Sequence, residues 1–134
     1  MIDNQKILYK FIQTNDNVNW YIISHKYILS ENFIREFKDE VNWLYISAYQ
    51  KLSQNFIREF QNKVYWNNIS ARQKLLEDFI REFKDKVDWN WISEYQKLSE
   101  NFIREFQNRV NWFRVVKYQK LSENFKKEFK HKIK

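Results

Sequence analysis

The chain contains no cysteine, no glycine and no proline among its 134 residues. Without cysteine it has no disulfide, no thiolate nucleophile and no cysteine-ligated metal site. Without glycine it has neither a glycine-rich phosphate loop nor a tight hairpin turn that requires a positive φ. Without proline its helices are not interrupted. We therefore expect uninterrupted helices, and the missing cysteines fit a reducing intracellular compartment.

Long apolar segments are missing as well, because no uncharged run approaches the length that crosses a bilayer. We therefore expect no membrane as a partner. Hydrophobic residues nevertheless make up 43% of the chain and aromatic residues 19%. This composition provides enough apolar surface for a packed core and is not that of a disordered chain.

A unit of 23 residues recurs five times along the chain, and each copy begins with a valine that we number position 1. A fixed period in this range is typical of a stacked array, so we predict one repeat domain over residues 1–134. Residues 1–17 are the predicted N-terminal partial repeat or cap, since residues 5–17 resemble the second half of a sixth unit that is one residue short. The five full repeats are residues 18–40, 41–63, 64–86, 87–109 and 110–132, of which the last is a predicted basic C-terminal cap.

The second half of each repeat has the pattern of a short capped helix. In the fourth repeat, Ser99 stands where an N-cap belongs. Leu98 before it and Ile103 four residues after it have the spacing of a hydrophobic staple. Phe102 and Phe106 follow four residues apart, on one helical stripe.

The first half repeats this logic, with Asp88 as the expected N-cap and Val87 and Ile92 at the staple positions. We therefore predict an all-α fold, an α-solenoid of stacked two-helix repeats. The alternative is a leucine-rich-like α/β solenoid, because aromatic and apolar residues alternate in the first half. That alternation breaks at Asn68 and Arg114, which favours the helix.

Helices this short are marginal on their own, so each repeat must cover its apolar face with a neighbouring copy. Positions 1, 3, 12, 16, 19 and 20 are accordingly identical in all five repeats. In the last repeat, Lys126 replaces an isoleucine and Lys127 replaces an arginine. These substitutions fit a terminal repeat whose outer face has no further neighbour.

The net charge of +7 is concentrated in residues 110–134, which hold +6 of it. Lys126, Lys127, Lys130 and Lys132 form the candidate basic end. A solvated end cap is favoured over phosphate binding as the reason for this charge. Elsewhere, we predict ion pairs within helices at i, i+4, such as Glu77–Arg81. We also predict that the invariant glutamates pair with the residue four positions on, as in Glu59–Lys63 and Glu105–Arg109.

No set of residues points to catalysis, a metal or a cofactor, so we predict a non-enzymatic protein. The recurring serines of the first half have no histidine base near them in sequence. The two histidines, His25 and His131, lie in the first and last repeats and cannot easily meet in an extended stack. The recurring glutamines at position 10, such as Gln96, are expected to satisfy backbone groups at the corner between helices.

Variation is concentrated at positions 4, 5, 8 and 9 of the first half, and we call these positions the first-helix face. Tyrosine, tryptophan and arginine are frequent there, as in interaction hot spots. The candidate partner-binding residues are Tyr45, Tyr49, Arg72, Trp91, Tyr95 and Tyr118. A protein or peptide partner is the first hypothesis. The alternatives are single-stranded nucleic acid bound by these rings and the basic end, end-to-end self-assembly in place of a monomer, and rings that merely pack between neighbouring helices.

The wording W-x-x-I-S-x-Y-Q-K-L-S-E-N-F-I-R-E-F, found at Trp89 to Phe106, resembles tandem repeats of predicted proteins from giant DNA viruses of the mimivirus group. The similarity spans residues 18–132. It implies a viral repeat protein of uncharacterised function that acts inside an infected cell, in the host cytoplasm, and it supplies no catalytic residues. The third repeat departs from the pattern at Leu76, where the N-cap serine is missing.

Overall fold

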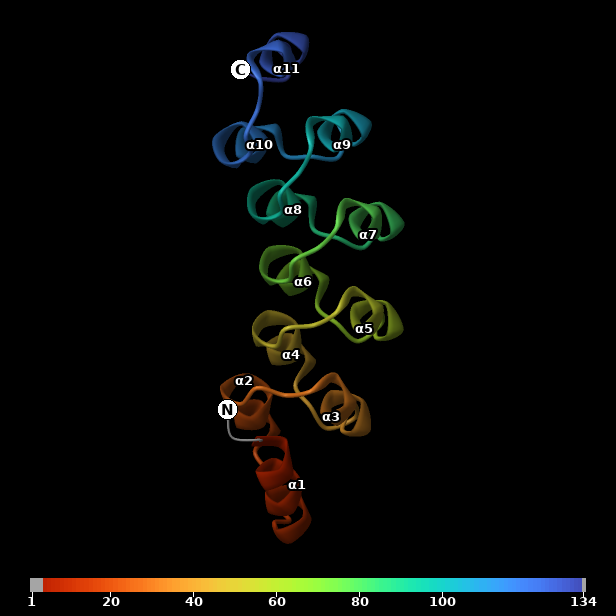
Figure 1. Cartoon of the computed structure of the whole chain (residues 1–134), viewed down its shortest axis with the longest axis vertical. Coiled ribbons are helices and arrows are strands. Elements are labelled where there is room, and N and C mark those ends of the chain that lie inside the picture. Colours follow the sequence, from red (N-terminus) through yellow and green to blue (C-terminus); the bar gives the residue numbers. More distant parts are fainter. Residues whose placement is uncertain (1–3, 134) are drawn as a thin grey trace. The chain divides into compact units, whose positions relative to one another are not determined.

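The structure is a computed structural model that describes residues 4–133. Within this range the regular elements are all helices, joined by short turns, which confirms the all-α prediction (Figure 1). The α/β alternative has no support there, because the described residues include no strand. The helices are α1 Asn4–Thr14, α2 Trp20–Lys26, α3 Glu31–Glu36, α4 Trp43–Tyr49, α5 Gln54–Glu59, α6 Trp66–Arg72, α7 Glu77–Glu82, α8 Trp89–Tyr95, α9 Glu100–Glu105, α10 Trp112–Tyr118 and α11 Glu123–Glu128.

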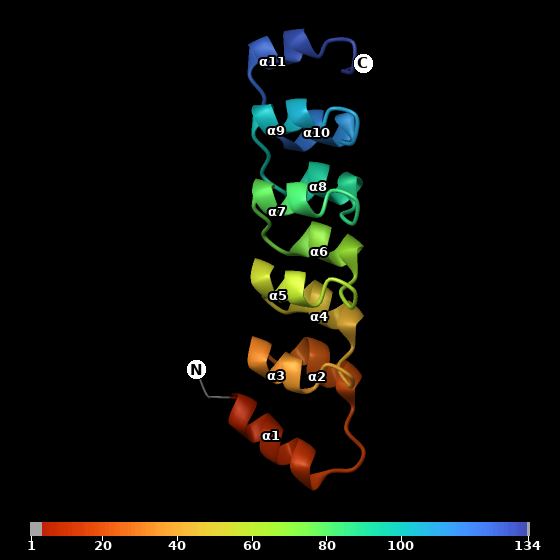
Figure 2. The ribbon, with the colours of Figure 1, turned by 90° about the vertical axis from the view of Figure 1, so that its right-hand side faces the viewer.

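Contacts within the chain group it into two compact units, Met1–Tyr65 and Trp66–Lys134. The boundary falls inside the third repeat, directly before its first helix. The single repeat domain over residues 1–134 stays a prediction. In the first unit α2 packs against α4, and in the second α8 packs against both α6 and α10. This repeated packing of neighbouring helices is that of an α-solenoid-like repeat (Figure 2).

The two helices of the fourth repeat begin at the predicted caps. In the fourth repeat, the Asp88 carboxylate accepts hydrogen bonds from the backbone N–H groups of Asn90 and Trp91, at 3.0 and 3.4 Å. Ser99 Oγ accepts one from the N–H of Phe102 at 3.1 Å. These caps explain why the alternating first half is helical, since a β-region cap followed by capped N–H groups starts a helix.

The second helix ends without a glycine. The N–H groups of Arg109 and Val110 both donate to the carbonyl oxygen of Phe106, at 2.9 and 3.0 Å. These bonds turn the chain into the next repeat with negative φ values only, and no described residue has a positive φ. The lack of glycine in the sequence is therefore compatible with the sharp turns between repeats.

Aromatic rings join the two helices of each repeat. In the fourth repeat the Trp89 ring lies 5.0 Å from Phe106 and 6.2 Å from Phe102, measured between ring centroids. Its indole N–H donates to the carbonyl oxygen of Lys84 in the preceding repeat at 2.9 Å. Phe102 and Ile103 beside this tryptophan are almost completely buried. The same tryptophan contacts occur in the second and fifth repeats, at Trp43 and Trp112.

Helix α1 takes the place of a second helix in the N-terminal partial repeat. The Tyr9 hydroxyl donates to Glu36 at 2.7 Å, and this hydrogen bond, together with burial, raises the pKa of Tyr9 to about 12. The Tyr9 ring lies 5.1 Å from Phe33, and Gln5 Oε1 accepts from the N–H of Ser30 at 2.9 Å. Tyr9 thus makes the contacts that an arginine makes in the full repeats.

The register of this partial repeat differs from the prediction. Gln5 and Ser30 are 25 residues apart, whereas the equivalent contact between Glu31 and Ser53 spans 22. The connection is therefore three residues longer than in the full repeats, and the expected one-residue deletion is wrong. The reason is that α1 runs as one helix of 11 residues, so extra chain is needed to reach α2.

Candidate partner-binding surface

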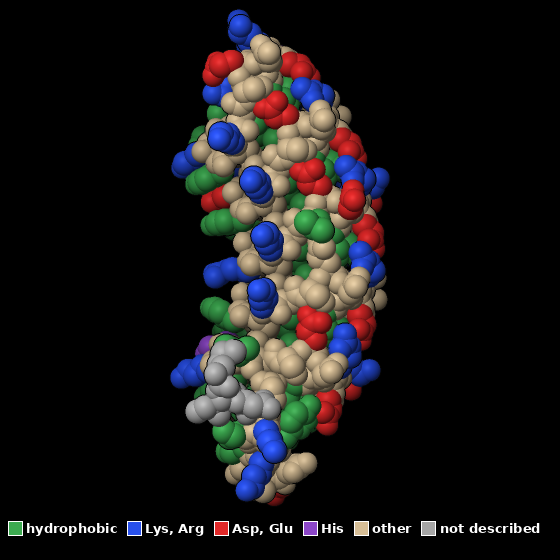
Figure 3. Space-filling model, in the orientation of Figure 1, with side chains coloured by type: hydrophobic (Ala, Val, Ile, Leu, Met, Phe, Trp, Pro, Cys, Tyr) green, Lys and Arg blue, Asp and Glu red, His purple; other side chains and the backbone are tan. Residues whose placement is uncertain are grey.

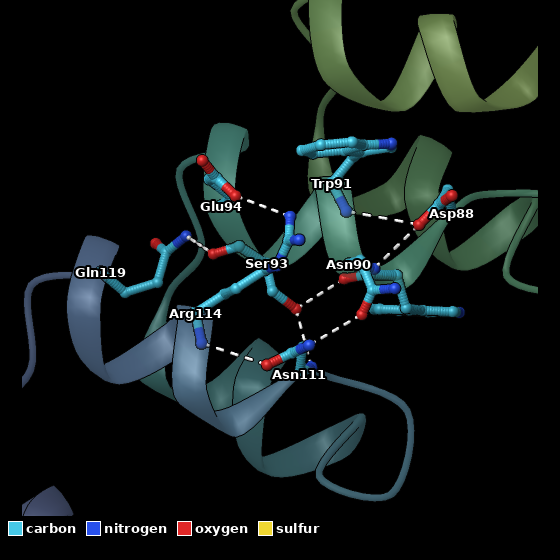
Figure 4. Close-up of polar contacts among 9 residues, drawn as sticks. Asp88, Asn90, Trp91, Ser93, Glu94, Asn111, Arg114 and Gln119 are labelled. Carbon is cyan, nitrogen blue, oxygen red and sulfur yellow. Dashed lines mark hydrogen bonds and ion pairs between the residues drawn. The ribbon is translucent and has the colours of Figure 1, made fainter.

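A buried serine sets the spacing of successive first helices. Ser93 Oγ donates to the carbonyl oxygen of Trp89 in its own helix at 2.6 Å. It also accepts from the N–H of Asn111, the N-cap of the next first helix, at 2.9 Å (Figure 4). Ser24 and Ser70 make the same pair of bonds. These hydroxyl groups are fully buried, and each of them bonds to backbone groups of two successive repeats.

In the second, fourth and fifth repeats, a glutamine connects the repeat to the corner of the repeat before it. Gln119 Oε1 accepts from the N–H of Leu98 at 3.0 Å. Its Nε2 donates to the carbonyl oxygens of Ser93 and Gln96, at 2.8 and 2.7 Å. Gln50 and Gln96 repeat this arrangement. The prediction that glutamines satisfy corner backbone is confirmed, with the addition that each serves the preceding repeat.

Together, the serine and the glutamine hold the first helices in register, so that positions 4, 5, 8 and 9 form a continuous face within each unit. Figure 3 shows hydrophobic side chains protruding over α4 and over α8, whereas acidic and basic side chains are interspersed over the second helices. Of the candidate residues, Tyr49, Tyr95 and Tyr118 are 55%, 57% and 48% exposed. The exposed character predicted for the first-helix face is therefore present at these tyrosines.

In the first unit, the rings of this face pack against one another. The Tyr45 and Tyr21 rings are 4.5 Å apart, and the Tyr45 hydroxyl donates to that of Tyr21 at 2.6 Å. This hydrogen bond, with a smaller contribution from burial, raises the pKa of Tyr45. Tyr49 stacks on Tyr45 with 5.7 Å between ring centroids. Packing between neighbouring helices thus accounts for Tyr45, whereas Tyr49 still presents more than half of its surface to solvent.

In the second unit, the same face is hollowed into a groove between α6 and α8, which we call the α6–α8 groove. Its volume is about 450 Å³, and its lining residues are Asn67, Asn68, Ala71, Arg72, Trp91 and Tyr95. The third repeat carries two asparagines, Asn67 and Asn68, where the second repeat carries the larger side chains of Leu44 and Tyr45, and this leaves room for the groove. Three of the six candidate residues, Arg72, Trp91 and Tyr95, are brought together in it.

The indole of Trp91 is held by charged neighbours on the side of α10. The Arg114 guanidinium lies 4.6 Å from the ring centroid and forms an ion pair with Glu94 at 2.6 Å (Figure 4). The Arg114 and Glu94 side chains are only 27% and 14% exposed, so solvent screens this pair weakly. Tyr95 lies 5.7 Å from Trp91 on the same helix. Trp91 is therefore fixed before any partner arrives.

Sequence reasoning missed this Glu94–Arg114 pair, although both residues stand at variable positions of the first-helix face. The two residues are 20 positions apart in the chain. A signal was present, since opposite charges stand at positions 8 and 5 of consecutive repeats. It becomes readable once neighbouring first helices are known to pack side by side.

The candidate basic residues lie on the other helix of the repeat. Lys126 and Lys127 belong to α11, and Lys130 and Lys132 follow it. Lys126 lies 3.5 Å from Glu123, and Lys132 Nζ lies 3.5 Å from the side-chain oxygen of Asn108. The candidate rings instead lie on first helices, where Lys117 approaches Tyr118 with 5.2 Å between Nζ and the ring centroid. The structure thus places the two predicted halves of a nucleic-acid site on different helices.

The predicted i, i+4 ion pair between Glu77 and Arg81 is wrong. Arg81 pairs instead with Glu105 of the next repeat at 2.7 Å, and its guanidinium lies 5.6 Å from the Phe102 ring. Glu77 accepts from the N–H and the hydroxyl of Ser99, at 2.6 and 3.0 Å. Helix α7 has only six residues, and both long side chains extend to the next repeat. There Arg81 contacts the Phe102 ring and Glu77 accepts from the N-terminus of α9.

The predicted pairing of Glu59 with Lys63, and of Glu105 with Arg109, is also wrong. Lys63 lies 3.7 Å from Asp39, and Arg109 lies 2.8 Å from Asp85, so both reach back to the preceding repeat. Glu59 accepts from Arg35 at 2.9 Å. The reason is that the second helix ends at the glutamate, so the residue four positions later is no longer on a helical turn.

Among the described residues, no three histidine or acidic side chains lie close enough to hold a metal ion. No helix in that part of the chain has the length and apolar character needed to cross a membrane. No protein-family model, curated protein or solved structure matches the chain.

Proposed function

We propose that this chain is a non-enzymatic helical-repeat protein that binds a protein or peptide partner through its first-helix face. The observation that carries this proposal is the α6–α8 groove. It joins two large rings, an arginine and two amides in a volume of about 450 Å³. Tryptophan, tyrosine and arginine are the residue types that most often contribute binding energy at protein interfaces.

The chemistry of the groove suits an extended peptide. The Asn67 and Asn68 side chains carry both a donor and an acceptor, which can pair with the backbone of a bound strand. Trp91 and Tyr95 offer apolar area that loses little rotamer entropy on binding. Because Arg114 and Glu94 already hold the indole, ordering it costs little when a partner binds. The expected ligand is a segment with one large apolar anchor.

The resemblance to giant-virus repeat proteins extends the proposal to the place where the chain acts. In that setting, the partner is a host protein met in the cytoplasm of an infected cell. The support is the wording of the repeat alone, in which tryptophan, serine, glutamine, leucine and paired phenylalanines recur at fixed positions.

A displayed peptide library panned against the whole chain tests the proposal. Peptides selected on wild type are expected to bind a Trp91→Ala/Tyr95→Ala variant at least about tenfold more weakly. Tyr65→Ala is the matched control, because Tyr65 is 48% exposed and lies outside the first-helix face. Equal affinity for wild type and the double variant would remove the groove as the binding site.

Single-stranded nucleic acid remains the second candidate, since Arg114 lies over Trp91 and Lys117 lies beside Tyr118. A salt titration separates the two, because phosphate contacts release counterions and lose affinity steeply as salt rises. An oligonucleotide that binds at low salt and competes with the selected peptides would favour this candidate. No binding at low salt would dismiss it.

A further inference from the structure

Helix α1 exposes an apolar face that every full repeat covers. By the register that aligns Tyr9 with the arginine of a second helix, Ile7 and Phe11 stand at positions 16 and 20. In the second repeat these positions are Phe56 and Phe60, which are 0% and 8% exposed. Ile7 and Phe11 are instead 61% and 46% exposed.

The cause of this difference is the covering helix. In the second repeat, the Trp43 ring of the first helix lies 6.2 Å from Phe56 and 5.0 Å from Phe60. The described part of the partial repeat has α1 but no first helix before it. The face that would receive the tryptophan of such a helix is therefore present without it.

A groove of about 300 Å³ marks the place, and we call it the α1–α2 groove. It lies between α1 and α2, and its lining is mainly apolar: Ile7, Leu8, Phe11, Ile22, Ile23 and Tyr27, with Asn17 and Asn19 at its edge. α2 packs against α4, so the groove lies where the contact from one first helix to the next would continue. Figures 1 and 2 both show α1 beside α2.

The residue at position 10 distinguishes this groove from the contact between two consecutive full repeats. Gln50, Gln96 and Gln119 reach back to the corner of the preceding repeat at this position. The first repeat has Tyr27 there, which lines the groove with a ring 41% exposed. With Tyr27 in place of the glutamine, the first repeat lacks the side chain that would bond to the corner backbone of a preceding repeat. The groove is therefore suited to a single helix with an apolar face.

We infer that the α1–α2 groove binds an amphipathic helix of a partner protein, carrying a tryptophan and an isoleucine three residues later on its apolar face. The tryptophan lies on Ile7 and Phe11, and the isoleucine lies against α2. This W-x-x-I pattern is that of the repeat's own first helices, at Trp43 and Ile46. The inference does not depend on the α6–α8 groove, since it rests on α1 and on the residues of α2 that line the α1–α2 groove.

The probe is a synthetic peptide of residues 39–53 that carries a fluorophore. A staple between the side chains at residues 44 and 48 keeps the peptide helical. The matched control peptide carries the same staple with Trp43→Ala and Ile46→Ser. Binding is measured by fluorescence anisotropy against the whole chain. The protein variants are Phe11→Lys and Ile7→Lys in the groove, and Tyr65→Lys as the control, because Tyr65 is 48% exposed and lies outside both the groove and the first-helix face.

Wild type and Tyr65→Lys are expected to bind the probe saturably and alike. Phe11→Lys and Ile7→Lys are expected to bind it at least about tenfold more weakly, as is wild type with the control peptide. Both groove residues are largely exposed, so their lysine variants should keep the circular dichroism spectrum of wild type. Absence of saturable binding to wild type, or equal binding by both groove variants, would overturn the inference. A wild-type dimer abolished by Phe11→Lys would overturn it too, by showing that a second copy covers the groove.

Discussion

At the scale of single residues, buried polar side chains explain why the repeats are so similar in sequence. The serines at position 7 are completely buried wherever they occur, and Gln50, Gln73 and Gln96 are almost so. No buried side-chain nitrogen or oxygen in the described residues lacks a hydrogen-bond partner. Buried polar groups are costly when unpaired, so each of these positions tolerates little change.

Replacement of Gln96 by alanine is expected to be among the most damaging single changes. It removes the partners of the Leu75 N–H and of two carbonyl oxygens, those of Ser70 and Gln73. Leaving these buried groups unpaired should lower the free energy of unfolding by about 3 kcal/mol. Urea denaturation measures the change.

The control for Gln96 is Gln107→Ala, which removes one local hydrogen bond to the Arg104 carbonyl oxygen at 3.0 Å. It should cost less than about 1 kcal/mol. Equal losses in the two variants would show that the corner contacts do not hold the repeats together.

The ion pairs between repeats predict the direction of one titration. The hydrogen bond and charge of Arg81 hold the pKa of Glu105 below its ordinary value of 4.5. The stability from this pair is therefore present above about pH 4.5 and is lost as the pH falls through the lowered pKa. NMR titration of the carboxyl should show a low pKa in wild type and a value nearer 4.5 in Arg81→Gln. Lys97→Gln, an exposed change of the same charge, should leave the pKa of Glu105 low.

At the scale of elements, the short helices are defined by their caps. Ser30, Ser53, Ser99 and Ser122 cap their second helices through their hydroxyl groups. Helix α7 starts at Leu76 without a side-chain cap bond, as the sequence indicated. Leu76 is also 63% exposed, so burial of its side chain does not compensate for the missing cap. The third repeat thus has the weakest helix start among the second helices.

Leu76→Ser is therefore expected to stabilise the chain by about 1 kcal/mol, by supplying the missing acceptor to the N–H groups of α7. The midpoint of chemical denaturation measures this. Leu76→Ala serves as the control, since it removes the same apolar surface without adding a cap. A midpoint unchanged or lowered by the serine, relative to the alanine, would contradict the assignment.

The elements could be predicted from the sequence because their signals are local. Period, caps and staples act within a few residues, and they located the helices. The ion pairs could not be predicted this way, because the Arg81–Glu105 contact joins residues 24 apart through side chains that cross between repeats. The α6–α8 groove was likewise hidden, although its residues were all among the variable positions. It depends on Asn68 and Trp91 being neighbours on adjacent helices.

At the scale of the whole molecule, the fifth repeat differs from the other four at position 17. Ile34, Ile57, Ile80 and Ile103 are fully buried at position 17, and Lys126 at the same position is exposed. A lysine there disfavours the docking of another repeat, because its charge would have to be desolvated. An exposed lysine at this position fits the predicted C-terminal cap, which stays a prediction.

The double substitution Lys126→Ile/Lys127→Arg gives the last repeat the Ile-Arg sequence of the other four. It should promote association between copies of the chain. The average mass from light scattering is expected to rise with concentration in this variant. The control is Lys120→Ile, which adds an isoleucine at an exposed position of the corner. A restored variant that behaves like this control would indicate that Lys126 does not act as a cap.

The central claim is that order arises between repeats and not within one. Circular dichroism and urea denaturation of three fragments test it most directly: residues 87–109, 87–132 and 64–132, with one, two and three repeats. We predict that the single repeat is largely unfolded, and that helix content per residue and the denaturation midpoint rise with each added repeat. A single repeat with the helix content of the longest fragment and its own cooperative transition would contradict the account.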